Sequence, residues 1–161
     1  MSIRSEAMAA APIAWPQVAL GGLLIALGDA AFATTYWFSW NVTGVTRMFQ
    51  SIAVGVLGKA SYDGGAGAAV LGAALHLVMA TMFVAAYALV ARRRPALLER
   101  PLAYGIAYGV LMYLIMNFVV MPLSRVGRAP SLEHPERLVW VVLAHLVFGV
   151  VCVLFARRAL R

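Results

Sequence analysis

Apolar residues dominate four stretches of the chain, at residues 18–38, 68–90, 101–123 and 138–156. Polar side chains are concentrated between these stretches, and Asp29 is the one charged residue inside them. A helix rises by about 1.5 Å per residue, so each stretch predicts a helix about as long as the roughly 30 Å hydrocarbon core of a bilayer. A backbone in lipid must satisfy its own hydrogen bonds, which favours helices over open strands.

The segment between the first two stretches is mixed in character. Within residues 45–60, apolar side chains and one lysine recur at helical spacing: Met48, Phe49, Ile52, Val56 and Lys59. This spacing predicts an amphipathic helix lying in the membrane interface, with a re-entrant segment as the alternative. The fold class predicted for the single domain, residues 1–161, is therefore an all-α integral membrane four-helix bundle with an interfacial amphipathic helix between helices 1 and 2.

Composition agrees with this pattern. Apolar residues make up 63% of the chain and charged residues 12%, against about 45–50% and about 25% in soluble domains. The lipid bilayer is thus the predicted partner of the apolar surface. One alternative for the first stretch is a secretory signal, because residues 18–27 resemble an apolar signal core and Ala31-Phe32-Ala33 resembles a cleavage site.

The net charge of +7 comes from basic residues that gather at the ends of the apolar stretches. Nucleic-acid binding needs a contiguous basic face, so this distribution argues against a nucleic-acid partner. Eight bases fall on the side of both termini: Arg4, Arg92, Arg93, Arg94, Arg100, Arg157, Arg158 and Arg161. Five fall on the other side: Arg47, Lys59, Arg125, Arg128 and Arg137. The positive-inside rule then predicts a multi-pass membrane protein with cytoplasmic N- and C-termini.

Each apolar stretch carries one strongly polar residue, and residue counting places all four at a similar depth. They are Asp29, His76, Asn117 and His145, which we call the polar layer. A carboxylate near mid-membrane costs about 2.5–3.5 kcal/mol on insertion scales, so Asp29 is expected to face the bundle interior and to find a partner. A histidine at the same level is the obvious candidate.

Three interpretations of the polar layer remain open at this stage. The side chains form a hydrogen-bonded clamp between helices, they handle a proton or small solute, or His76 and His145 ligate a b-type haem. The first of these corresponds to a structural or stress-related membrane protein. The chain has no sequence motif of a soluble enzyme active site, so we predict no enzymatic activity, no metal site and, apart from the haem alternative, no cofactor.

Small residues indicate where helices approach one another closely. Gly105 and Gly109 form a GxxxG pair, and Gly72 lies in the second stretch. Such residues let helix backbones approach closely in lipid. We expect packing within one chain, with a homo-oligomer as the alternative.

Several short sequences over roughly the last 95 residues form a recognisable set: Gly72-Ala73-Ala74-Leu75-His76, Tyr87, the glycine-containing start of the third stretch, Met121-Pro122-Leu123 and His145-Leu146-Val147. In these sequences the chain resembles the YagU-like family of small bacterial inner-membrane proteins. The resemblance implies an inner-membrane helical bundle without established chemistry. The first outer loop of this chain is shorter than that of the family.

Overall fold

The computed structural model describes residues 12–128 and 135–161, of which residues 135–137 are described by their backbone alone. Its long helices are α2 (Trp15–Trp37), α4 (Gly65–Arg93), α5 (Pro101–Ile115) and α7 (Pro135–Ala159). No strand occurs in these described ranges. The prediction of an all-α bundle is confirmed, and four helices are long and apolar enough to cross a membrane when α5 is counted with its continuation to Leu123.

Shorter elements connect and extend the long helices. They are α3 (Val42–Leu57), the 3-10 helices η1 (Gly58–Asp63) and η2 (Pro95–Leu98), the π-helix η3 (Met116–Val120) and α6 (Met121–Leu123). The third apolar stretch was predicted as one regular helix, whereas its last third is a π-helical turn followed by a short α-helix. The other three long helices begin about one turn earlier than the hydropathy pattern predicts.

Local sequence explains where several helices begin and end. The Asn41 side chain caps α3 by accepting a hydrogen bond from the Gly44 backbone N–H, 2.7 Å away, as expected of an N-cap residue. α5 begins at Pro101, whose ring fits the first turn of a helix. α4 ends with Arg92 and Arg93 in its last turn, where positive charge complements the helix dipole.

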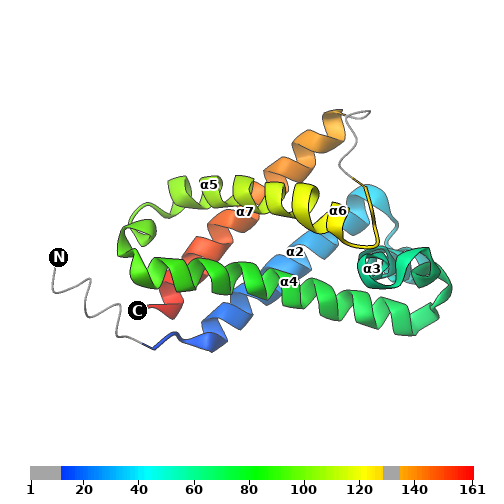
Figure 1. Cartoon of the computed structure of the whole chain (residues 1–161), viewed down its shortest axis with the longest axis horizontal. Helices are drawn as coiled ribbons and strands as arrows, with labels where there is room; N and C mark the ends of the chain where they lie inside the picture. Colours follow the sequence, from blue (N-terminus) through cyan, green and yellow to red (C-terminus); the bar gives the residue numbers. More distant parts are fainter. Residues whose placement is uncertain (1–11, 129–134) are drawn as a thin grey trace.

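The long helices cross one another, as Figure 1 shows. α2 packs against α4 and α7, and α5 packs mainly against α7. The start of α2, the chain's C-terminus and η2 lie at one end, and α3 lies at the other. A backbone hydrogen bond of 2.9 Å from Ala14 N–H to the Ala159 carbonyl ties the first of these ends together. We call the two halves of the bundle the terminal half and the α3 half.

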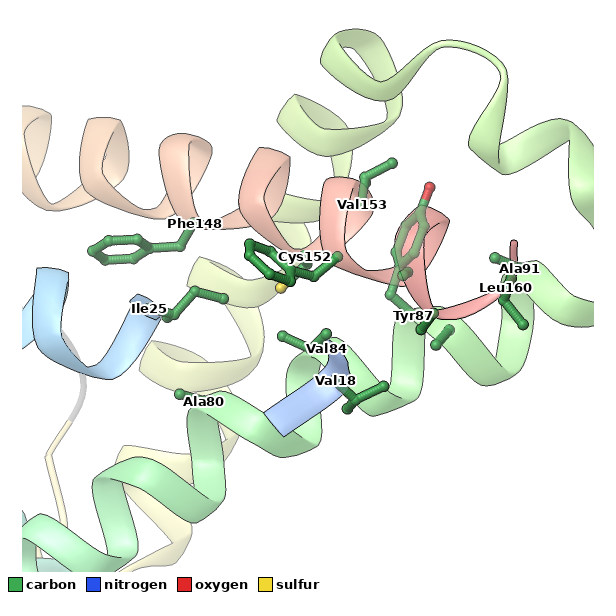
Figure 2. Packing of buried hydrophobic residues seen from close by; sticks show 14 of the residues in the cluster. Val18, Ile25, Ala80, Val84, Tyr87, Ala91, Phe148, Cys152, Val153 and Leu160 are labelled. Carbon is green, nitrogen blue, oxygen red and sulfur yellow. The ribbon is translucent and has the colours of Figure 1, made fainter. Parts of the chain in front are cut away.

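The apolar core occupies the terminal half, where side chains from several helices meet (Figure 2). Val84, Cys152 and Val153 have no exposed surface, and Val18 is 1% exposed. The α3 half has few buried residues on its long helices. Beyond the polar layer, the buried residues of the described long helices are Thr34, Ala68 and Gly72.

α3 is seen almost end-on in Figure 1, so its axis runs across those of the long helices. Its buried face carries Met48, Gln50, Ala53 and Val54. The Gln50 carbonyl accepts a hydrogen bond from the Ser61 hydroxyl at 2.6 Å. The Gly55 carbonyl accepts one from the Arg125 N–H at 3.0 Å. α3 is therefore fixed to the bundle on two sides.

Candidate functional site

The polar layer lies at the boundary between the two halves of the bundle. The members of the core cluster nearest the α3 half are Ala26 in α2, Ala80 in α4, Met112 in α5 and Phe148 in α7. Following each helix from there toward the α3 half, the polar residue comes within about one turn: Asp29, His76, Asn117 and His145 respectively. The four side chains thus mark the level at which the closed core ends.

Asp29 and His76 meet across the α2–α4 contact. The Nε2 atom of His76 lies 3.5 Å from Oδ2 of Asp29 and 3.1 Å from the carbonyl oxygen of Ala26. Both neighbours are acceptors, so Nε2 must carry the hydrogen, and it donates to the Ala26 carbonyl. The Asp29 side chain keeps 34% of its surface exposed, against 16% for His76. The carboxylate is therefore the more accessible partner.

The close approach of α2 and α4 sets up this pair. A Cβ on Gly22 would overlap the Thr81 side chain and lie 2.6 Å from its Cα, so glycine permits the two backbones to approach here. Asp29 lies two turns along α2 from Gly22, and His76 lies five residues along α4 from Thr81. Both are displaced toward the α3 half, which brings them to the same level.

His145 has a different set of contacts. Its Nδ1 atom lies 2.8 Å from the Val141 carbonyl oxygen of its own helix, so Nδ1 carries the hydrogen. The ring packs edge to face against Tyr113 of α5, with centroids 5.6 Å apart, and against Phe148, at 6.3 Å. The carboxylate of Asp29 lies within electrostatic range of both histidines. Three of the four residues therefore form one group.

Asn117 belongs to η3, the π-helical turn of the third span. Its Nδ2 donates a 3.0 Å hydrogen bond to the Tyr113 carbonyl, and Tyr113 contacts His145. No hydrogen bond or ion pair joins Asn117 directly to the other three residues in the described part of the chain. π-Helical turns are frequent at functional sites.

The predicted packing glycines all lie at close helix contacts within this one chain. A Cβ on Gly72 would overlap the Phe49 carbonyl of α3. A Cβ on Gly105 would lie 2.5 Å from the Val150 Cα, and one on Gly109 would overlap the His145 carbonyl. Gly149 of α7 faces both Gly105 and Gly109. The α5–α7 contact is therefore made largely by backbone against backbone.

Sequence reasoning missed two residues that shape the site. Tyr113 was not selected as a site residue, although it lies one turn before Asn117 and so shares its helix face. Gly149 was not identified because α7 has no GxxxG pair. Its position four residues after His145 places it on the same face as that histidine, which is the signal that was available.

The side chains of the polar layer can be compared with the ligands that a metal ion or a haem requires. Among the described residues, no group of three or more His, Cys, Asp or Glu side chains is placed to hold a metal ion. Haem with two histidine ligands needs a free ring nitrogen on each. Nε2 of His145 meets this need, whereas Nε2 of His76 points at Ala26 and Asp29. The two histidines as placed do not fit a haem held through both Nε2 atoms.

Comparison with protein-family models, curated proteins and solved structures found no match to the chain.

Proposed function

We propose that this chain is a non-enzymatic, multi-pass membrane protein that handles a proton or small solute at its polar layer. The observation that carries the proposal is the Asp29–His76 pair, 3.5 Å apart, with the carboxylate partly exposed at the level where the closed core ends. Acid and histidine side chains inside membrane spans are costly and mark proton or ion pathways. Histidine changes charge near neutral pH, which suits reversible protonation.

The geometry supports a simple proton step. A proton arrives at Nδ1 of His76, which makes no hydrogen bond among the described residues. Nε2 then gives its own hydrogen to Oδ2 of Asp29, so one N–H bond forms, one N–H bond breaks and one O–H bond forms. The pair ends as neutral histidine and neutral carboxylic acid. Reversal of these steps releases the proton.

Orientation in the membrane is part of the proposal. The terminal half carries a dense group of bases at its end: Arg92, Arg93, Arg94, Arg100, Arg157, Arg158 and Arg161. This supports an orientation with the terminal half toward the cytoplasm, and the resemblance to the YagU-like family supports the bacterial inner membrane as the location. The polar layer would then be reached from the outer face. An interfacial position for α3 and a relationship to the YagU-like family are consistent with this arrangement.

The structural alternative rests on one observation. The bond from His76 Nε2–H to the Ala26 carbonyl joins two helices, as a clamp would. Such bonds between membrane helices contribute about 0.6 kcal/mol on average. A clamp predicts a change in stability when the layer is altered, and no flux to lose.

Proton movement into proteoliposomes tests the proposal. A potassium diffusion potential provides the driving force and an enclosed pH-sensitive dye reports the flux. We expect a flux with the unaltered chain and its loss, by tenfold or more, in Asp29→Asn, because the amide cannot accept the proton. The matched control is Thr35→Val, since Thr35 lies farther along the same helix and bonds the Ala31 carbonyl of its own helix.

Two results would argue against the proposal. The first is an unaltered chain that inserts fully and gives no more flux than empty liposomes. The second is Asp29→Asn with unchanged flux. Lower thermal stability of Asp29→Asn without any flux in the unaltered chain would identify the polar layer as a clamp.

A further inference from the structure

The end of the terminal half carries a dense group of positive charges, which we call the arginine rim: Arg92, Arg93, Arg94, Arg100, Arg157, Arg158 and Arg161. Among the described residues of this end, the one acidic side chain is Glu99. The helix dipoles largely cancel, because α2 and α5 begin at this end whereas α4 and α7 finish there. The side chains therefore set the sign of the charge, and that sign favours an anionic partner.

The short helix η2 ties the parts of the arginine rim to one packed unit. It contacts α4, α5 and α7, the three helices whose ends carry these arginines. The Tyr87 hydroxyl of α4 donates a 2.7 Å hydrogen bond to the Leu97 carbonyl of η2. Leu98 is buried in the same apolar cluster as Ala91 and Leu160. The arginines thus belong to one rigid end of the bundle and not to separate loose tails.

The protein itself leaves much of this charge unpaired. Arg93, Arg94 and Arg100 are exposed, and their guanidinium groups make no hydrogen bond or ion pair within the described ranges. The guanidinium of Arg158 lies over the Phe155 ring, 4.8 Å from its centroid, and a stacked guanidinium still directs its N–H groups outward in its own plane. Such groups bind phosphate through paired, charge-assisted hydrogen bonds.

Exposed apolar side chains lie one helical turn from exposed arginines on two helices. Leu89 of α4 is 43% exposed and precedes Arg93 by four residues, and Leu154 of α7 is 41% exposed and precedes Arg158 by four. Residues four apart share a helix face. A charged group above an apolar surface has the same order as a phospholipid, whose phosphate lies above its acyl chains. A soluble phosphate compound or a nucleic acid offers no apolar part for the leucines.

We propose that the arginine rim binds anionic phospholipid, with headgroup phosphates at exposed arginines such as Arg93, Arg94 and Arg158 and acyl chains against Leu89 and Leu154. This inference goes beyond the proposed function, because it concerns the other end of the bundle and does not involve the polar layer. Anionic lipid is favoured over zwitterionic lipid, since the trimethylammonium group of phosphatidylcholine cancels the charge of its phosphate. The contribution of each arginine adds to the others without requiring one shared lipid position.

Thermal unfolding of the purified full chain in detergent micelles with added lipid tests the proposal. Dioleoyl phosphatidylglycerol is compared with dioleoyl phosphatidylcholine, which has the same acyl chains. We expect a saturable rise in Tm, with half of the rise reached at a concentration at least about tenfold lower for phosphatidylglycerol. Higher salt should reduce this preference. Glycerol 3-phosphate, which has the phosphate without acyl chains, should give no rise at the same concentrations.

Variants connect the preference to the arginine rim. In the triple variant Arg93→Gln, Arg94→Gln, Arg100→Gln, the concentration of phosphatidylglycerol giving half of the rise is expected to increase about tenfold to a hundredfold, because three cationic contacts are lost. Lysine at the same three positions should keep that concentration within about threefold, because the charge remains. These side chains are exposed, so both variants should fold like the unaltered chain.

The matched control removes three positive charges from the α3 half: Lys59→Gln, Arg125→Gln, Arg128→Gln. It should leave the preference for phosphatidylglycerol unchanged. Equal half-rise concentrations for the two phospholipids would overturn the proposal, as would an unchanged value in the arginine-to-glutamine variant. Equal weakening in the control would show that net charge and not the arginine rim is responsible. A rise with glycerol 3-phosphate equal to that with phosphatidylglycerol would replace the lipid by a soluble phosphate compound.

Discussion

The two halves of this bundle are closed in different ways. In the terminal half, apolar side chains from the long helices pack around Val84, Cys152 and Val153, none of which has exposed surface. In the α3 half, the residues of η3 and α6 include none that are buried, and α3 covers α4 near Gly72. The difference suggests that one half supplies most of the stability, and that polar side chains are tolerated where its tight packing ends.

The polar residues illustrate this division of roles. A charged side chain within the terminal half would have to replace apolar contacts on every side, at high cost. At the boundary, Asp29 keeps 34% of its side-chain surface exposed while still meeting His76. The polar side chains and the tight apolar packing are thus separated along the helices, and substitutions on each side of the boundary should have different effects.

The largest expected effect concerns the α5–α7 contact. In Gly109→Ala the new Cβ overlaps the His145 carbonyl, and forcing extra volume into a packed site costs about 1–3 kcal/mol. The same substitution at Gly67 meets nothing within 4 Å and should raise stability slightly, because alanine favours helix over glycine. Thermal unfolding in one detergent measures both. Equal Tm values for the two variants would contradict the account.

A smaller effect is expected from removing apolar side chains in the two halves. Val84→Ala removes two methyl groups from a residue with no exposed surface, whereas Val119 of η3 is 47% exposed. We expect a loss of about 1–2 kcal/mol in the first case and under about 0.5 kcal/mol in the second. Denaturant unfolding of both variants in mixed micelles gives the two values. A greater loss from Val119→Ala would reverse the assignment of the halves.

The smallest expected effect compares the two histidines, which lie at one level but bond differently. His76 bonds across to α2, whereas His145 bonds within α7. Phenylalanine keeps an aromatic ring and adds the same small volume at either position, so hydrogen bonding is the main difference between the two variants. His76→Phe should cost about 0.5–1.5 kcal/mol, and His145→Phe less. The reverse order in thermal unfolding would show that the link to α2 is not the stronger one.

Hydropathy and length were sufficient to predict the four long helices, because a run such as residues 68–90 has no other stable form in lipid. The π-helical turn at Met116–Val120 was not predictable in the same way. Its residues are as apolar as those of the preceding α5, apart from Asn117, and hydrophobic periodicity does not distinguish a wide turn from a regular one. The position of α3 against Gly72 depends on contacts between elements far apart in the sequence.

For the candidate site, counting residues along each helix placed Asp29, His76, Asn117 and His145 at one level. Counting could not show which histidine faces Asp29, since that depends on how the helices are rotated about their axes. The rotation of α2 against α4 is set by the close contact of Gly22 with Thr81. The sequence alone does not show that Gly22 and Thr81 are in contact, so it does not give the rotation of the two helices.

Accessibility of the polar layer to water tests the central claim most directly. In a Cys152→Ala background, cysteines are introduced at Asn117, in the layer, and at Val84, in the core of the terminal half. A membrane-impermeant maleimide is then added to intact bacterial cells expressing the chain. The account predicts labelling at position 117 and none at position 84, because the proposed function requires water to reach the layer from the α3 half and not to pass beyond it. Labelling at position 84, or protection of position 117 in cells and in inverted vesicles alike, would contradict it.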